Sequence, residues 1–390
     1  MRLLHVAALL ESGRLELEEF IGSDVPSYAI LSHTWGHDEV LYSDIASGRA
    51  HTEHVWIDTC CINKSSSAEL QEAINSMYRA ETCYVYLKDV NTPTHVDFDI
   101  FRCQFRSSRW FSRGWTLQES LVPRSVQFFV SSGKPLWPFS TTSAHDDRRS
   151  LVAEITSATN FAEDIIAAGP GVIHERSIAT RMSWAATRIT TREEDIAYSL
   201  LGIFNVNMPL LYGEGRKAFR RLQQTLLDQS DDSSIFCWTS SAREERAGRI
   251  QLSGLLADEP SHFSSIAPTI MAARPQNCAQ AQPYSMTNKG LQITLPLIQF
   301  SRNIYLGLLD CRLVGRGGAT HRAAIYIIRL LSGTNQFARL LPDMVVPASA
   351  AIDTSSLKVE TILVRQGSGP RVHSLTQEDL PSFFTGNTRS

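Results

Sequence analysis

The residues with the clearest potential for chemistry are an indole and a carboxylate, Trp115 and Glu119, four positions apart. On a helix, residues at i and i+4 share one face, so an aromatic wall and a carboxylate could line one pocket. A carboxylate fixed in a water-poor site stabilises positive charge that develops on a substrate. The alternative is a carboxylate on a helix surface, paired with Arg113 or Arg124. The spacing by itself leaves both interpretations of Glu119 open.

Further polar residues directly follow two apolar runs, in the segments 32–36 and 58–63. His33 could act as a general base, although a single histidine beside a tryptophan is more often a hydrogen-bonded structural residue. Asp58 could orient a sugar hydroxyl or cap the turn that follows it. The candidate binding residues are Ser32, His33, Trp35, Gly36, Asp58 and Trp115.

Other residue types in these segments have two interpretations or exclude a class of site. Trp35, Trp110 and Trp115 could stack on a flat ligand ring or serve as core aromatics. The adjacent Cys60 and Cys61 are expected to be small buried hydrophobes, because no His/Cys spacing suits zinc, and we predict no metal site. The phosphate-binding, nucleophile-elbow and zinc-protease signatures are also missing from the sequence.

A parallel sheet would position these candidates. Four apolar runs of strand length occur early in the chain, at residues 28–32, 54–62, 83–90 and 125–130. Between the second and third runs, residues 66–78 show the apolar spacing of a helix and open with a capping box. The alternation predicts an α/β fold with right-handed crossovers. Ligands bind at the carboxyl ends of such strands, where the segments 32–36 and 58–63 lie.

The sequence pattern changes after this region. A Ser/Thr/Asp-rich and then Gly-rich stretch precedes residues with helical spacing on both sides of Pro209. Short β-prone runs follow, separated by Gly, Asn and Ser, at residues 235–238, 291–298, 305–309, 323–331 and 359–364. We predict an α/β domain at 1–135, a connecting segment with a helical extension at 136–232, and a β-rich C-terminal domain at 233–390.

Composition narrows the partners and the compartment. The formal net charge of -3 disfavours a nucleic-acid partner, which normally needs a basic face. The apolar stretches are too short for a membrane span. Seven cysteines without C-x-x-C spacing favour reduced thiols and a cytoplasmic location.

Three segments together resemble the HET domain (heterokaryon incompatibility) family of fungi. They are residues 28–36 (Tyr-Ala-Ile-Leu-Ser-His-Thr-Trp-Gly), 56–63 (Trp-Ile-Asp-Thr-Cys-Cys-Ile-Asn) and 108–119 (Ser-Arg-Trp-Phe-Ser-Arg-Gly-Trp-Thr-Leu-Gln-Glu). Residues 192–202 and 211–215 look like segments that often follow this domain. The resemblance implies a cell-death signalling protein concerned with self–nonself recognition. The C-terminal β-prone region carries no such resemblance.

HET domains are in turn similar to TIR domains, which implies a TIR/flavodoxin-like sheet flanked by helices at the N-terminus. In NAD⁺-cleaving TIR domains a glutamate four residues after a tryptophan is catalytic, and Trp115 and Glu119 have this spacing. The resemblance therefore implies NAD⁺ as a substrate, with Glu119 catalytic and no bound cofactor.

The competing hypothesis is a module without enzymatic activity that signals cell death by self-association. Related TIR enzymes act as assemblies, so the resemblance implies self-association in either case. A protein partner could bind the C-terminal region.

Overall fold

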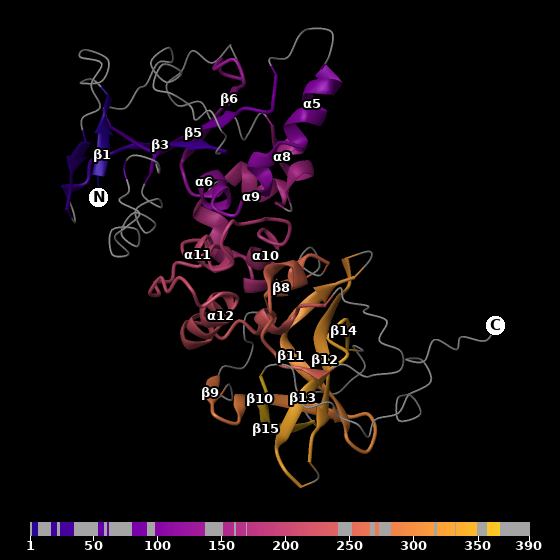
Figure 1. Cartoon of the computed structure of the whole chain (residues 1–390). Helices are drawn as coiled ribbons and strands as arrows, with labels where there is room; N and C mark the ends of the chain where they lie inside the picture. The colour runs from indigo at the N-terminus through magenta and orange to yellow at the C-terminus, as the bar shows by residue number, and fades with distance from the viewer. Residues whose placement is uncertain are drawn as a thin grey trace. The chain divides into compact units, whose positions relative to one another are not determined.

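The computed structural model is divided by its contacts into two compact units, Met1–Glu175 with Thr187–Ala218, and Arg176–Ala186 with Phe219–Ser390 (Figure 1). The structure describes residues 2–6, 17–21, 24–34, 54–57, 61, 80–91, 98–136, 151–159, 161–168, 170–240, 252–265, 270–272, 282–315, 318–331, 333–348 and 357–366. The three domain ranges predicted from sequence concern independent folding and stay a prediction.

Among the described residues, the first unit contains one sheet in the order β2-β1-β4-β3-β5-β6. Its strands are β1 (Arg2–His5), β2 (Leu17–Glu19), β3 (Ala29–His33), β4 (His54–Trp56), β5 (Thr82–Leu87) and β6 (Ser125–Val130). β3 is parallel to β4 and β5, and β5 is parallel to β6, whereas β1 is antiparallel to both of its neighbours. The predicted α/β class with a parallel sheet is confirmed.

The order of the parallel strands indicates at which edge of the sheet a ligand would bind. Numbered along the chain, β3, β4, β5 and β6 take the order 2-1-3-4 across the sheet, which is the flavodoxin-like arrangement. The chain reverses its direction of winding between β3 and β5. Loops at the carboxyl ends diverge at such a point and leave a crevice for a ligand. A ligand is therefore expected to bind at the carboxyl ends of β3 and β5.

An apolar layer supports this edge. Val85 on β5 lies opposite Phe128 on β6, and both are buried. The ring of Phe128 is 5.3 Å from that of Phe105 and 5.8 Å from that of Trp110, both in edge-to-face contact. Burial of these rings fixes the segments that carry them against the sheet. The other face of β5 is only partly buried.

The helices of the first unit follow the sheet strands or connect them. They are α5 (Phe98–Arg106), η3 (Arg109–Ser112), α6 (Thr116–Leu121), α8 (Val152–Ala158), α9 (Glu163–Ala168), η4 (Pro170–Glu175) and α11 (Asp195–Tyr198). The buried carboxylate of Glu154 on α8 accepts from Arg106 on α5 at 2.6 Å and lies 3.0 Å from Arg102. This ion-pair cluster joins α5 to α8.

The second unit contains α10 (Ile178–Ser183), most of α12 (Lys217–Gln229), η5 (Ser233–Phe236) and η6 (Pro260–Phe263). The 13-residue helix α12 turns Phe219, Leu222 and Leu226 inward at helical spacing. The helical expectation after Pro209 is thus confirmed for α12. The expected strand at 235–238 is wrong, because residues 235 and 236 belong to a 3-10 turn and residues 237 and 238 are not in a strand. Asp232 caps this turn by accepting from the Ser234 N–H at 3.0 Å.

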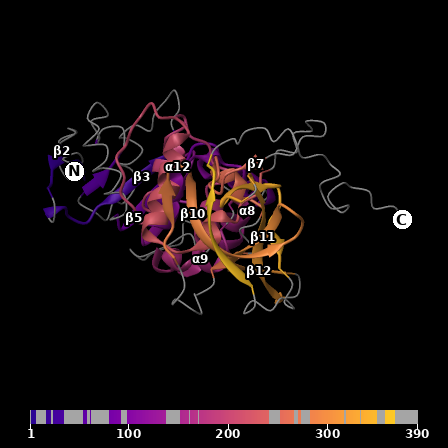
Figure 2. The same cartoon turned by 90° about the horizontal axis from the view of Figure 1, so that it is seen from below.

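The C-terminal sheet has the order β14-β12-β11-β10-β15-β13-β7 among the described residues, and Figure 2 shows β10, β11 and β12 running beside one another. Its strands are β7 (Leu252–Ser253), β8 (Ile270–Ala272), β9 (Ser285–Thr287), β10 (Gly290–Gln299), β11 (Ile304–Val314), β12 (Thr320–Arg329), β13 (Gln336–Leu340), β14 (Val346–Pro347) and β15 (Lys358–Val364). This confirms the predicted β-rich C-terminal region.

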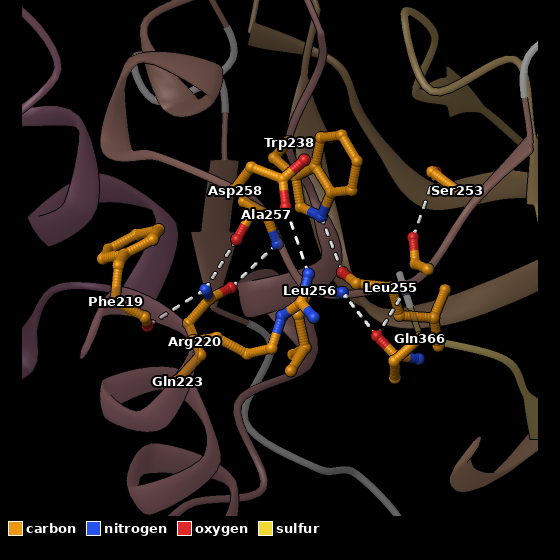
Figure 3. A network of polar contacts seen from close by, with 11 residues as sticks. Phe219, Arg220, Gln223, Trp238, Ser253, Leu255, Leu256, Ala257, Asp258 and Gln366 are labelled. Atoms are coloured by element: carbon orange, nitrogen blue, oxygen red, sulfur yellow. Dashed lines mark hydrogen bonds and ion pairs between the residues drawn. The ribbon is translucent and has the colours of Figure 1, made fainter. Parts of the chain in front are cut away.

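The side-chain amides of Gln223 and Gln366 bind the backbone of the segment that follows β7 (Figure 3). Gln223 on α12 donates to the Ala257 carbonyl at 2.8 Å and accepts from the Ala257 N–H at 2.9 Å. Gln366, just after β15, accepts from the N–H groups of Leu255 and Leu256, each at 3.2 Å. The segment after β7 is therefore tied both to α12 and to the end of β15.

Within the part of the chain that the structure describes, none of the helices has both the length and the apolar character needed to cross a bilayer.

Candidate functional site

A chain of hydrogen bonds at the carboxyl end of β3 orients the carboxylate of Glu119. The indole Nε1–H of Trp110 donates to Ser32 Oγ at 2.6 Å, and the Ser32 hydroxyl donates to Glu119 Oε2. Trp110 is fully buried and Ser32 is 1% exposed, whereas Glu119 is half-buried. Because the indole can only donate, the serine hydroxyl must point its proton at the carboxylate. The carboxylate is thus fixed on the side that faces the protein.

The carboxyl end of β5 positions the tryptophan. Asp89 accepts from Ser108 Oγ at 2.7 Å and from the Arg109 N–H at 2.8 Å, which fixes the start of η3 and hence Trp110. No motif in the sequence pointed to Asp89, which lies two residues after the end of β5. Both strands that flank the reversal of winding therefore contribute to holding Glu119.

Helix α6 presents Glu119 at the register predicted from the Trp115 spacing. Trp115 has helical backbone angles and directly precedes the helix. Leu117 and Leu121 are buried, which turns Glu119 toward the partly exposed face. Thr116 Oγ1 donates to the Trp110 carbonyl at 2.5 Å and so links the helix start to η3.

A buried cation lies near this carboxylate. Arg188 is 7% exposed and its Nη1 donates to the Arg113 carbonyl at 2.8 Å and to Thr116 Oγ1 at 2.9 Å. Burial lowers the pKa of Arg188 to about 9, and the charge of Glu119 opposes that shift. Arginine therefore stays protonated at neutral pH and its charge favours the ionised form of Glu119. No motif in the sequence pointed to Arg188.

The Trp115 side chain forms a hydrogen bond with the carboxylate of Asp195. Burial raises the pKa of Asp195, while hydrogen bonds from Tyr212 and from the Trp115 side chain oppose the rise. The Tyr212 hydroxyl donates to Asp195 Oδ1 at 2.9 Å, and the guanidinium carbon of Arg192 is 4.5 Å from the Tyr212 ring centroid. Asp195 of the downstream motif segment 192–202 is thus the hydrogen-bond partner of the Trp115 side chain. A pocket that Trp115 shares with Glu119 stays a prediction.

The downstream segments pack directly against the α6 region. The Gly114 N–H donates to the Ile189 carbonyl at 3.0 Å, and the Ile189 N–H donates to the Ser112 carbonyl at 2.7 Å. A Cβ atom on Gly114 would lie 2.3 Å from Thr190 Cγ2, so only glycine allows this close approach. Gln118 of α6 also donates to the Tyr198 carbonyl at 3.3 Å, so the motif 192–202 is part of the support for the helix that carries Glu119.

Glu194 of the first downstream segment holds the turn in the second downstream segment, residues 211–215. Its Oε1 accepts from the Gly213 N–H at 2.7 Å and from the Gly215 N–H at 2.9 Å. Both glycines have positive φ, at 100° and 59°, which explains why this turn carries two glycines. These backbone hydrogen bonds, led by that of Gly215, lower the pKa of Glu194.

The other predicted binding residues have different outcomes. His33 ends β3 beside Tyr86 of β5 and is 8% exposed. Trp35, Gly36 and Asp58 lie outside the described residues, as does the predicted helix at 66–78. Binding roles for all of these residues stay predictions. Among the described residues there is no group of three His, Cys, Asp or Glu side chains that could hold a metal ion.

The arrangement combines a half-buried carboxylate, a hydroxyl that fixes its orientation and a buried guanidinium that favours its charge. Such a carboxylate can stabilise a cationic transition state without reorganising, because its hydrogen bond and counter-charge are already in place. The hydroxyl of Ser32 can be buried because it both accepts and donates a hydrogen bond.

Comparison with known proteins gives one informative match. The chain is 43% identical over 230 residues to the vegetative incompatibility protein HET-E-1 of Podospora anserina. The match covers 52% of this chain and only 16% of that protein, so the chain spans a small part of its relative. No family model matches the chain, and no solved structure matches it. The similarity supports the resemblance to heterokaryon incompatibility proteins.

Proposed function

We propose that this chain is a cytoplasmic incompatibility protein of the HET type, acting in self–nonself recognition and cell-death signalling. Its similarity to a vegetative incompatibility protein supports this role. We further propose that its first unit is a TIR-like domain that hydrolyses NAD⁺ to nicotinamide and ADP-ribose through Glu119. The observation that carries the activity is the oriented Glu119 carboxylate at the reversal point of the parallel sheet.

One carboxylate is sufficient for this reaction. The nicotinamide leaves from a cationic nitrogen as a neutral ring, so the leaving group needs no proton, unlike the alcohol released by most glycosidases. The ribose then carries positive charge, which the Glu119 carboxylate stabilises. Water adds to the ribose carbon and its proton passes to the carboxylate or to solvent, so the products are nicotinamide, ADP-ribose and one proton.

The surrounding residues act on the carboxylate rather than on the substrate. The Ser32 hydroxyl holds one carboxylate oxygen in place, and the positive charge of Arg188 attracts the negative charge of the carboxylate. Each of these contributions reduces the cost of reorganisation as the transition state forms.

The test is NAD⁺ consumption by concentrated purified protein, followed by chromatography. Glu119→Gln should reduce the rate on the order of 100-fold to 1000-fold, as expected for loss of a fixed charge in an active site. Ser32→Ala should reduce it by about 10-fold, because the carboxylate remains but loses its orientation. Glu193→Gln is the matched control, since that exposed carboxylate pairs with Arg216.

Circular dichroism should show that all three variants are folded. Equal NAD⁺ loss by the parent and by Glu119→Gln would remove Glu119 from the mechanism. No loss by the parent at concentrations where light scattering shows assembly would exclude the hydrolase activity.

The second candidate is an interaction module without catalysis, and two exposed apolar side chains favour it. Ile189 and Leu211 in the first unit are 73% and 52% exposed. Exposed apolar side chains mark a protein interface where they gather into a contiguous patch. If self-association carries the signal, Ile189→Glu should reduce the mass measured by light scattering and reduce cell death, while Glu119→Gln should leave both unchanged.

A role for the C-terminal region in binding a protein partner can be tested by truncation, but the structure restricts where to cut. Asp232 accepts from the Ile178 N–H at 2.7 Å, and Ser234 accepts from the Ala179 N–H at 3.1 Å. A chain ending at residue 232 would therefore lose part of the support for α10. Partner capture by the full chain, compared with substitutions on the exposed face of the sheet, avoids this problem.

A further inference from the structure

Two buried thiols face each other in the second unit. Cys237 directly follows η5 and Cys311 lies on β11, and their sulfur atoms are 3.2 Å apart. Both side chains are fully buried and both are free cysteines. A disulfide needs the sulfur atoms about 2.05 Å apart, so the pair has to close by roughly 1 Å. No part of the function proposed above uses these cysteines.

A buried arginine holds the backbone on both sides of Cys237. Arg339 on β13 is 0% exposed, and it donates to the Phe236 carbonyl at 3.0 Å and to the Trp238 carbonyl at 2.6 Å. Its guanidinium carbon lies 4.1 Å from the centroid of the Trp238 ring, whose indole N–H in turn donates to the Leu255 carbonyl at 2.6 Å (Figure 3). These contacts hold Cys237 in its position opposite Cys311.

The positive charge of the same arginine also acts on Cys237. Burial, reinforced by Cys311, raises the pKa of the Cys237 thiol, while the positive charge of Arg339 opposes the rise. Burial lowers the pKa of Arg339 to about 10, and Cys237 opposes that shift. The Nε atom of Arg339 has no hydrogen-bond partner in the described part of the chain. A thiolate formed at Cys237 would therefore interact with the positive charge of Arg339, whose hydrogen-bond donors are only partly used.

We propose that Cys237 and Cys311 are a redox pair that closes reversibly to a disulfide and so locks η5 to β11. With a peroxide as the oxidant, the Cys237 thiolate attacks one peroxide oxygen, and cleavage of the O–O bond leaves a sulfenic acid and releases water. The Cys311 sulfur then attacks the Cys237 sulfur and displaces a second water. The two thiols lose two electrons and two protons, and the peroxide gains them.

The burial of both thiols determines how this pair behaves. The reactive species is the thiolate, so the pair resists oxidation until local opening or a sustained oxidant allows reaction. Cys103 on α5 is exposed and should react sooner. Since Cys237 and Cys311 are 74 positions apart, the disulfide would close a long loop and restrict the unfolded chain.

The test uses the full chain treated with hydrogen peroxide a few degrees below its melting temperature. Free thiols are then alkylated in denaturant, and the digest is analysed by mass spectrometry without reduction. We expect a linked peptide containing Cys237 and Cys311 that disappears after treatment with dithiothreitol. Oxidation should also raise the melting temperature by roughly 5 °C.

Two variants make the assignment specific. Cys103→Ser should keep both the linked peptide and the rise in melting temperature, whereas Cys311→Ser should lose both. The linked peptide is measured on the parent chain, so the result holds even if Cys311→Ser folds poorly. The proposal fails if Cys103 becomes oxidised while Cys237 and Cys311 are both recovered alkylated. It also fails if the link forms only in denaturant, or if Cys237 links equally to Cys278.

Discussion

The two compact units each bury an arginine, but the two guanidinium groups have different surroundings. Arg188 in the first unit donates to a backbone carbonyl and a threonine hydroxyl and interacts with the charge of Glu119. Arg339 in the second unit donates to two backbone carbonyls and lies over the Trp238 ring. Burial lowers the pKa of Arg188 to about 9 and that of Arg339 to about 10.

The difference shows how burial of a similar side chain can serve two purposes. In the first unit the arginine shares its charge with a half-buried carboxylate, and such a pair sets the electrostatics of a site. In the second unit the arginine is a rigid donor that holds the backbone on both sides of one cysteine. Removing the charge should therefore have a larger effect in the first unit than in the second.

The largest effect is expected for Arg188→Met. This change leaves the Glu119 carboxylate without its buried counter-charge and should reduce the free energy of unfolding by about 3 kcal/mol. Urea denaturation followed by fluorescence measures the loss. The double variant Arg188→Met with Glu119→Gln should recover part of it, because both interacting charges are removed together. Additive effects of the two changes would show that the charges do not interact.

The next effect is expected for Gly114→Ala, which tests how the segment that carries Arg188 docks against α6. The added methyl group would collide with Thr190 Cγ2, and overpacking at such a contact should cost about 2 kcal/mol of unfolding free energy. Thr190→Ser removes the colliding atom and should restore most of the stability in the double variant. If Thr190→Ser gives no recovery, the close approach is not what requires glycine.

A smaller effect is expected for Arg339→Met. The change removes two donors to backbone carbonyls but also removes a charge that is costly to bury, so the net loss should be about 1 kcal/mol. Thermal and urea unfolding of this variant, measured beside Arg188→Met, gives the direct comparison. A larger loss for Arg339→Met than for Arg188→Met would reverse the order expected for the two units.

The smallest effect concerns acid stability and Glu194. Because its pKa is lowered in the folded chain, the unfolded chain takes up the proton first as the pH falls. Its stabilisation is present above the unfolded pKa and is lost as the pH falls through the folded pKa. Glu194→Gln should therefore flatten the loss of stability below about pH 4.5 by roughly 0.5 kcal/mol. Glu193→Gln is the control, and an equal flattening there would remove Glu194 as the cause.

Much of the sheet could be predicted from sequence, and the support of the site could not. The apolar runs that became β3, β5 and β6 have the length and composition of strands, so their residue types were sufficient. The local sequence around Asp89, Arg188 and Asp195 does not indicate which distant residues these side chains contact. Their roles follow from contacts with residues that are distant along the chain, such as Ser108 for Asp89 and Thr116 for Arg188.

The sequence by itself determined the strands of the parallel sheet in the first part of the chain, the β-rich C-terminal region and the helical register of Trp115 and Glu119. These features depend on local periodicity, which survives in any arrangement of the elements. Only the tertiary structure decided that Trp110 and Ser32 orient Glu119, that Arg188 lies behind it, and that Cys237 faces Cys311. Those contacts join residues separated by many positions, and they exist only because packing brings distant segments of the chain together.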